Sequence, residues 1–315
     1  MIRQQLGGYC HRIKKVSLEF INNVLHRFET RPVKQVKGFK YSPIFIIGPP
    51  RSGSTLLFQV MVNTFNFSYT TNADAKWYGG LSFRKRFFPV PSKETKTDFN
   101  SNHGQTRGRY APHECGEYWY QFFRRKPQYV SIDEVEGEKL KHLTRSLQRL
   151  TTAGKSPMLF KNMNCALRLG PVHKACPDAL YIVTHRSMLW NGHSLLQVRH
   201  KVNGDYNKWW SMEPEEIDNI SNLPPEEQVI EQIRAIHQEI NEQKRHIGAN
   251  RFIDIHYEDL CEDPKKVMSN MNDFFKQHGI QMLSSLENIP DSFPLSEQCR
   301  IEAPVFDRLR SYVGS

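Results

Sequence analysis

The stretch that decides the fold is residues 48–55, which read Gly48-Pro49-Pro50-Arg51-Ser52-Gly53-Ser54-Thr55. The apolar run Ile44-Phe45-Ile46-Ile47 comes directly before it, and Leu56-Leu57-Phe58-Gln59-Val60-Met61 follows. This order predicts a buried strand over 43–47, a glycine-rich turn, and a helix over about 54–65. Because a helix N-terminus presents unpaired N–H groups and the positive end of the helix dipole, it binds phosphate well. The stretch therefore predicts a phosphate-binding loop; the alternative is a Gly-Pro turn that merely precedes a helix.

The cation of this loop stands at an unusual position. After Gly53, where loops that bind nucleoside triphosphates carry a Lys, this chain has Ser54, and the cation is Arg51. Phosphoryl transfer needs that Lys and a magnesium ion to offset a heavily charged leaving group. A 5′-phosphosulfate carries a sulfuryl group with a single negative charge, which N–H groups, one Arg and two hydroxyls can hold. We therefore expect a phosphosulfate site without a metal ion.

With these residues the chain resembles the sulfotransferases, of bacterial type, that use 3′-phosphoadenosine 5′-phosphosulfate (PAPS). Their 5′-phosphosulfate loop reads much like Pro50-Arg51-Ser52-Gly53-Ser54-Thr55-Leu56-Leu57. The resemblance covers about residues 42–280 and implies a P-loop-like sulfotransferase fold. It also implies that the donor is bound by residues of this loop, namely Pro50, Arg51, Ser52, Gly53, Ser54 and Thr55.

Apolar runs and helical patterns alternate along the chain, which predicts an α/β fold with a parallel sheet covered by helices on both faces. Further strands are expected at 67–70, 158–161, 179–184 and 252–255. Helices are expected from Pro112, over 132–152, from 186 to about 200, from Pro224, and over 263–279. The segment 71–111 lacks a clear pattern, and so long a connection is usually functional or disordered.

Polar side chains follow several of the predicted strands, where ligands of a parallel sheet bind. Arg186 ends one strand, and Ser194 follows eight residues later. This spacing resembles the 3′-phosphate motif of the family, although Ser187-Met188 stand where Asp-Pro is common. A guanidinium and a hydroxyl suit a terminal phosphate; the alternative for Arg186 is a surface ion pair. Lys161 ends another strand, and the resemblance implies that its ammonium lies near the transferring group, unless it is a solvated strand end.

A general base assists transfer to acceptor hydroxyls because their pKa is high. Ala111-Pro112-His113-Glu114, before the aromatic stretch at 118–119, resembles bacterial sulfotransferases with a Pro-x-Glu at this place, which implies Glu114 as the base. Glu114 can also be an ordinary acid of a first helical turn. His113 and His103 are the next candidates, followed by Asp74.

The composition limits the kinds of ligand and the cellular compartment that we expect for this protein. The 315 residues carry a net charge of +10, which favours anionic ligands. The basic residues are spread out, so we expect no nucleic acid partner. The six cysteines form no metal-binding or disulfide pattern, which is typical of a reducing compartment, so we expect a cytoplasmic protein. No apolar run is long enough to span a membrane.

We divide the chain into a sulfotransferase domain at 41–280 and two flanking segments. Residues 1–40 are basic and mildly amphipathic, which predicts a helix packed on the domain or lying on an anionic membrane through residues 10–30. Residues 281–315 are expected to pack on the domain or trail from it.

The sequence and its resemblance to the family predict a PAPS-dependent sulfotransferase that transfers a sulfuryl group by in-line attack of an acceptor hydroxyl or amine. The acceptor is a small molecule, a carbohydrate or a lipid. A P-loop kinase or NTPase and a non-catalytic nucleotide-binding protein are the alternatives. Oligomeric state is left open. Aromatic side chains can stack on a sugar or a flat aromatic acceptor, although aromatics are more often core; the candidates are Trp77, Tyr78, Trp119, Trp190, Trp209 and Trp210.

Overall fold

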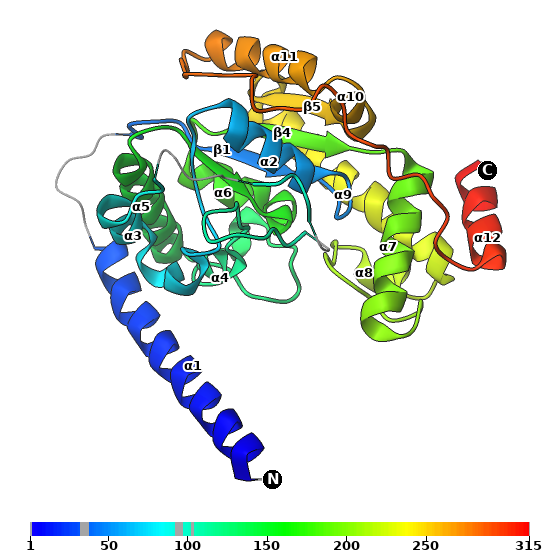
Figure 1. The fold of residues 1–315 in the computed structure, drawn as a ribbon, viewed down its shortest axis with the longest axis horizontal. Coiled ribbons are helices and arrows are strands. Elements are labelled where there is room, and N and C mark those ends of the chain that lie inside the picture. The colour runs from blue at the N-terminus through cyan, green and yellow to red at the C-terminus, as the bar shows by residue number, and fades with distance from the viewer. Residues whose placement is uncertain (1, 32–37, 92–96, 102–103, 315) are drawn as a thin grey trace.

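The computed structural model describes residues 2–31, 38–91, 97–101 and 104–314, and the side chains from residue 16 onward within these ranges. A five-stranded sheet of parallel strands forms its centre (Figure 1). The order is β2-β3-β1-β4-β5, with all neighbouring pairs parallel. The strands are β1 (Ile44–Ile47), β2 (Ser68–Tyr69), β3 (Met158–Lys161), β4 (Leu180–His185) and β5 (Phe252–His256). The predicted parallel α/β sheet is confirmed.

Alternate residues of β1 bury into two separate cores, because side chains of a strand point to opposite faces. Phe45 and Ile47 join one apolar cluster with residues of α5, α6 and α9. Ile44 and Ile46 join the other, with residues of α2 and α11. The sheet is therefore covered on both faces, which explains why β1 reads as a continuous apolar run. The covering helices are α2 (Ser54–Thr64), α5 (Gly137–Gly154), α6 (Leu169–Ala175), α9 (Pro225–Ile247) and α11 (Pro264–Gln277).

The remaining helical elements lie around this core. They are α1 (Ile2–Glu29), η1 (Ala75–Gly80), α3 (Leu81–Phe87), α4 (Gly116–Trp119), η2 (Ile132–Glu134), η3 (Met163–Arg168), α7 (Met188–Asn203), α8 (Ile217–Ile220), η4 (Ala249–Arg251), α10 (Tyr257–Glu262) and α12 (Ala303–Gly314). No helix in the described part of the chain is long and apolar enough to cross a membrane.

Two local expectations differ from the structure. The segment 71–111, which shows no clear pattern, contains η1 and α3. The helix expected from Pro112 begins only at Gly116. The preceding residues are held extended, since the His113 N–H donates to the Thr70 carbonyl at 2.8 Å, and Cys115 then turns the chain with a left-handed φ of 49°. Glu114 therefore precedes the helix instead of lying in its first turn.

The two ends of the chain lie on different sides of the domain (Figure 1). Helix α12 packs against α7 and α9, with Phe306 and Leu309 buried between them. The segment 281–302 that leads to α12 crosses the molecule near α10 and α7. At the other end, α1 leaves the domain as a long helix and contacts it at η1, α3 and α5.

Candidate active site

The loop between β1 and α2 approaches its neighbours too closely for side chains at two glycines. Gly48 has φ +142°, and a Cβ there would lie 2.6 Å from the Thr184 Oγ1. Gly53 has φ +88°, and a Cβ there would lie 2.3 Å from the Tyr257 ring. Positive φ and this lack of space both require glycine. The loop consequently packs closely against β4 and α10. Helix α2 begins directly after it, at Ser54.

Hydrogen bonds within the loop and to β4 and α7 fix its conformation. The Ser52 hydroxyl lies 2.7 Å from the Pro49 carbonyl and 2.6 Å from the Thr184 hydroxyl. The Asn191 amide donates to the Pro50 carbonyl at 2.8 Å. The Ser52 side chain is therefore buried between the loop and β4. Other residues of the loop line the pocket; these are Pro50, Arg51, Gly53, Ser54 and Thr55. No sequence motif marks Thr184 or Asn191, so their support of the loop was not predictable from the sequence.

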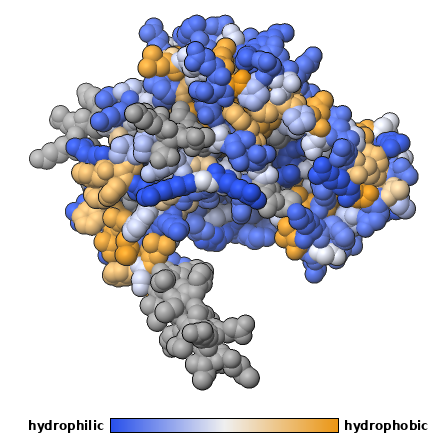
Figure 2. Space-filling model, viewed as in Figure 1, coloured by the Kyte–Doolittle hydropathy of each residue, from blue (hydrophilic) through white to orange (hydrophobic). Residues whose placement is uncertain are grey.

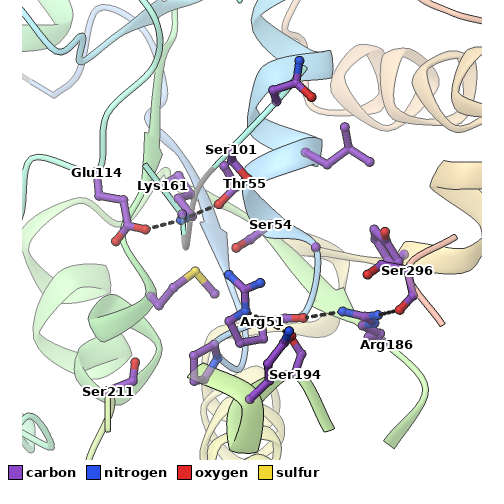
Figure 3. Close-up of a pocket in the computed structure, with 18 of the residues that line it drawn as sticks. Arg51, Ser54, Thr55, Ser101, Glu114, Lys161, Arg186, Ser194, Ser211 and Ser296 are labelled. Carbon is purple, nitrogen blue, oxygen red and sulfur yellow. Dashed lines mark hydrogen bonds and ion pairs between the residues drawn. The ribbon is translucent and has the colours of Figure 1, made fainter. Parts of the chain in front are cut away.

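Two arginines meet at one side of this pocket (Figure 3). The Arg51 Nε donates to the Ser194 Oγ at 3.0 Å, and one Arg186 amino group donates to the Arg51 carbonyl at 3.3 Å. Arg186 also donates to the Ser296 carbonyl and stacks 4.7 Å above the Tyr257 ring. Burial, followed by the charge of Arg186, lowers the pKa of Arg51, and burial lowers the pKa of Arg186.

This arrangement suits a bound anion. Two like charges packed together in a partly buried place destabilise one another, and an anion between them relieves the repulsion. The Arg186 Nε is buried and has no hydrogen-bond partner among the described residues. Buried donors are normally paired, so this atom has capacity for a ligand oxygen. The residues present therefore fit the 3′-phosphate and 5′-phosphosulfate of PAPS.

A charged pair lies at the other side of the loop (Figure 3). The Lys161 ammonium, at the end of β3, is almost fully buried and forms an ion pair with the Glu114 carboxylate. The same ammonium donates to the Thr55 Oγ1 at 3.2 Å. A buried ammonium requires such partners because it loses its hydration. Lys161 thus places a positive charge beside the first turn of α2, although position 54 itself is a Ser. The ion pair with Lys161 holds the Glu114 carboxylate at the same place.

The other candidate bases are placed differently. His113 is only partly exposed, its Nδ1 accepts the Cys115 N–H at 2.9 Å, and burial lowers its pKa. Asp74 is buried, forms ion pairs with Lys85 at 2.6 Å and Arg84 at 3.4 Å, and is not a pocket-lining residue. His103 lies outside the described residues. Of the described candidates, Glu114 lines the pocket beside the loop, and His113 does not.

The pocket that joins these groups is large, with a volume of about 1140 Å³. One wall comes from the C-terminal segment, which the Arg186 bond to the Ser296 carbonyl and the Arg300 N–H bond to His193 Nε2 at 2.9 Å hold over α7. Aromatic and polar residues, together with Met163, also line the pocket. These are Tyr120, Lys126, Gln128, Met163, Asn164, Trp209, Trp210 and Ser211.

The comparisons with known proteins agree with this geometry. The model of a sulfotransferase family matches residues 43–278, most of the chain. The chain therefore belongs to the sulfotransferase family. A search of curated proteins finds no match. The described residues contain no group of three or more His, Cys, Asp or Glu side chains arranged to hold a metal ion.

Solved structures that are similar to this chain include two sulfotransferases of low sequence identity. Sulfotransferase STF9 from Mycobacterium avium superposes with a TM-score of 0.51 and 15% identity, over 87% of this chain and 68% of that one. Sulfotransferase STF1 from Mycobacterium tuberculosis H37Rv gives a TM-score of 0.49 and 16% identity, over 76% of this chain and 68% of that one. The P-loop-like sulfotransferase fold expected from the loop is confirmed by the superposition on STF9.

Proposed function

We propose that this protein transfers a sulfuryl group from PAPS to a hydroxyl or amine of an acceptor by direct in-line attack. The observation that carries the proposal is the Lys161–Glu114 pair beside Thr55, because it brings a cation and a carboxylate to the mouth of a phosphate-binding loop. The family match supports sulfuryl transfer in general. The choice of PAPS as donor rests on the two arginines and the unpaired Arg186 Nε.

We assign the donor-binding roles as follows. The loop N–H groups from Arg51 to Thr55 and the hydroxyls of Ser54 and Thr55 hold the 5′-phosphosulfate at the start of α2. Arg186 and Ser194 hold the 3′-phosphate, with Arg51 between the two anionic groups. Ser52 contributes its backbone N–H, since its hydroxyl is used beneath the loop.

The chemical roles belong to the Lys161–Glu114 pair. Glu114 accepts the proton of the acceptor hydroxyl or amine as the new bond to sulfur forms. The bond between sulfur and the bridging phosphate oxygen breaks, and negative charge grows on the released 5′-phosphate. Lys161 and the N-terminus of α2 stabilise that charge, which is the type of electrostatic contribution that dominates many transfer reactions. His113 and His103 remain the alternative bases.

The acceptor binds, in this proposal, between Glu114 and the pocket-lining residues Tyr120, Trp209 and Trp210. Aromatic faces and amide groups in one pocket suit a carbohydrate, a flat small molecule or the head of a lipid. We also propose a cytoplasmic location, which is supported by the five described cysteines, all of them free thiols.

The reaction itself is tested by measuring what the protein releases from nucleotides. With PAPS and a panel of phenol, amine, sugar and sterol acceptors, we expect release of 3′-phosphoadenosine 5′-phosphate that depends on one acceptor class. ADP release from ATP and magnesium, with no reaction of PAPS, would instead identify the P-loop kinase alternative.

Replacing Arg186 by Ala separates the two anionic sites. Losing a charged hydrogen bond costs roughly 1.5–3 kcal/mol, so we expect the affinity for 3′-phosphoadenosine 5′-phosphate to fall by about one to two decades. Adenosine 5′-phosphosulfate lacks the 3′-phosphate, so its affinity is expected to change little. Calorimetry with both nucleotides measures the difference. An equal loss for both would show that Arg186 acts through the Arg51 carbonyl and not on the 3′-phosphate.

A further inference from the structure

Two polar side chains of helix α1 form hydrogen bonds to the domain. Asn22 is fully buried; its amide group donates to the Lys76 carbonyl at 3.0 Å, and its oxygen accepts the Gly79 N–H at 2.8 Å. Glu29 accepts the backbone N–H and the hydroxyl of Ser82, both at 2.8 Å. Two buried polar side chains therefore hold α1 on the domain, together with Leu25, which packs against Gly80.

Four apolar side chains of α1 form an exposed row on the side away from Asn22 and Glu29. Val16, Phe20, Val24 and Phe28 follow one another at intervals of four residues, which places them along one side of the helix. Phe20 is 69% exposed and Phe28 is 50% exposed. Single exposed apolar residues are common, but a continuous row on one helix marks a surface with a partner.

Helix α3 extends this row into a patch. Phe83, Phe87 and Phe88 are 53%, 58% and 57% exposed, and the rings of Phe83 and Phe87 lie 4.5 Å apart. Phe28 joins Phe83 and Phe87 in lining a groove of about 500 Å³ between α1, α3 and α5. Figure 2 shows hydrophobic residues gathered at the lower left, where Figure 1 places α3 and the C-terminal end of α1. We call Val24, Phe28, Phe83 and Phe87 the α1–α3 patch.

Basic residues surround the α1–α3 patch. The Arg31 guanidinium lies 4.3 Å from the centre of the Phe28 ring, and that of Arg86 lies 5.9 Å from the centre of the Phe87 ring. Arg27 is exposed on α1 beside them. The acid that lines the groove, Glu29, is buried and bonded to Ser82. The rim is therefore positive, while its centre is aromatic.

We propose that the α1–α3 patch binds the surface of an anionic lipid bilayer. Aromatic side chains enter the boundary between headgroups and acyl chains, and arginines at the rim pair with lipid phosphates. A second copy of the chain fits less well, because an isologous contact would bring two positively charged rims together. The inference does not depend on the proposed function.

Vesicle binding by the full-length protein tests this inference. We expect binding to vesicles of equal parts phosphatidylcholine and phosphatidylglycerol, weaker binding to pure phosphatidylcholine, and a loss of affinity as salt is raised. The double variant Phe83→Ser/Phe87→Ser should bind the anionic vesicles about tenfold more weakly or worse. The variant Leu283→Ser, which removes an exposed apolar side chain on another part of the surface, should bind as the wild type does.

A second variant keeps the test independent of folding. Arg27→Gln/Arg86→Gln leaves the apolar residues in place and should lower affinity for anionic vesicles by about tenfold or more, with little effect on pure phosphatidylcholine. Unchanged Tm and nucleotide affinity exclude a folding defect. Absence of vesicle binding by the wild type would overturn the proposal. So would a wild-type dimer in sedimentation velocity that the Phe83→Ser/Phe87→Ser variant converts to monomer, since the patch would then join two copies.

Discussion

Replacing Glu114 by Gln is expected to lower kcat by about two to four decades while nucleotide affinity stays nearly unchanged. The Gln side chain keeps the size of Glu and still offers an oxygen to the Lys161 ammonium, but it cannot accept a proton from the acceptor. The rate of 3′-phosphoadenosine 5′-phosphate release at saturating PAPS measures the loss of turnover, and calorimetry with the bisphosphate measures affinity.

A matched control distinguishes the role of Glu114 from a general loss of charge. Glu117 lies three residues further on, is exposed, and forms an ion pair with Arg125 away from the pocket. Glu117→Gln should leave kcat within a few-fold of wild type. If Glu114→Gln is equally active while His113→Ala or His103→Ala is inactive, the base is a histidine and the assignment to Glu114 is wrong.

Replacing Lys161 by Met is expected to lower kcat by about two to three decades, comparable to the loss of one preorganised oxyanion donor. Met is about as long as the Lys stem and suits the buried end of β3, so packing is largely kept. The change removes the ammonium between Thr55 and Glu114. Single-turnover measurements of sulfuryl transfer would detect the loss in the chemical step.

The control for this variant is Lys174→Met, which removes an exposed ammonium from α6 and should have no effect on turnover. The double variant Glu114→Gln/Lys161→Met adds a second check. Residues that act as a unit are not additive, so the double variant should lose little more than the more damaged single variant. Fully additive losses would mean that the two side chains act separately, contrary to the pairing in the pocket.

The sheet was predictable because its signals are local. Each central strand is a short apolar run that ends in a polar residue, as in Lys161 and His185, and both faces of such a strand are buried in a parallel sheet. The N-terminus of α11 carries its own signal, and the Asp263 side chain accepts the Lys266 N–H as expected of a cap. The loop at 48–55 was recognisable because two glycines are required by the backbone itself.

What could not be predicted depends on contacts between distant residues. Thr184 supports the loop from β4, more than 130 positions along the chain from Ser52, and no local pattern indicates this. Helix α4 begins at Gly116 and not at Pro112, because His113 is hydrogen-bonded to Thr70, on the other side of the segment 71–111. The helical spacing in α1 predicted an amphipathic helix, but only the bonds of Asn22 and Glu29 to η1 and α3 show which face meets the domain.

The use of PAPS as donor, the central claim, is tested most directly by calorimetry with the purified protein in the presence of a metal chelator. The account predicts that 3′-phosphoadenosine 5′-phosphate binds under these conditions, because loop N–H groups, Arg51, Arg186 and Ser194 hold its phosphates. In a parallel titration without chelator, ATP with magnesium is expected to bind far more weakly. Tight, magnesium-dependent binding of ATP together with no binding of the bisphosphate would contradict the account.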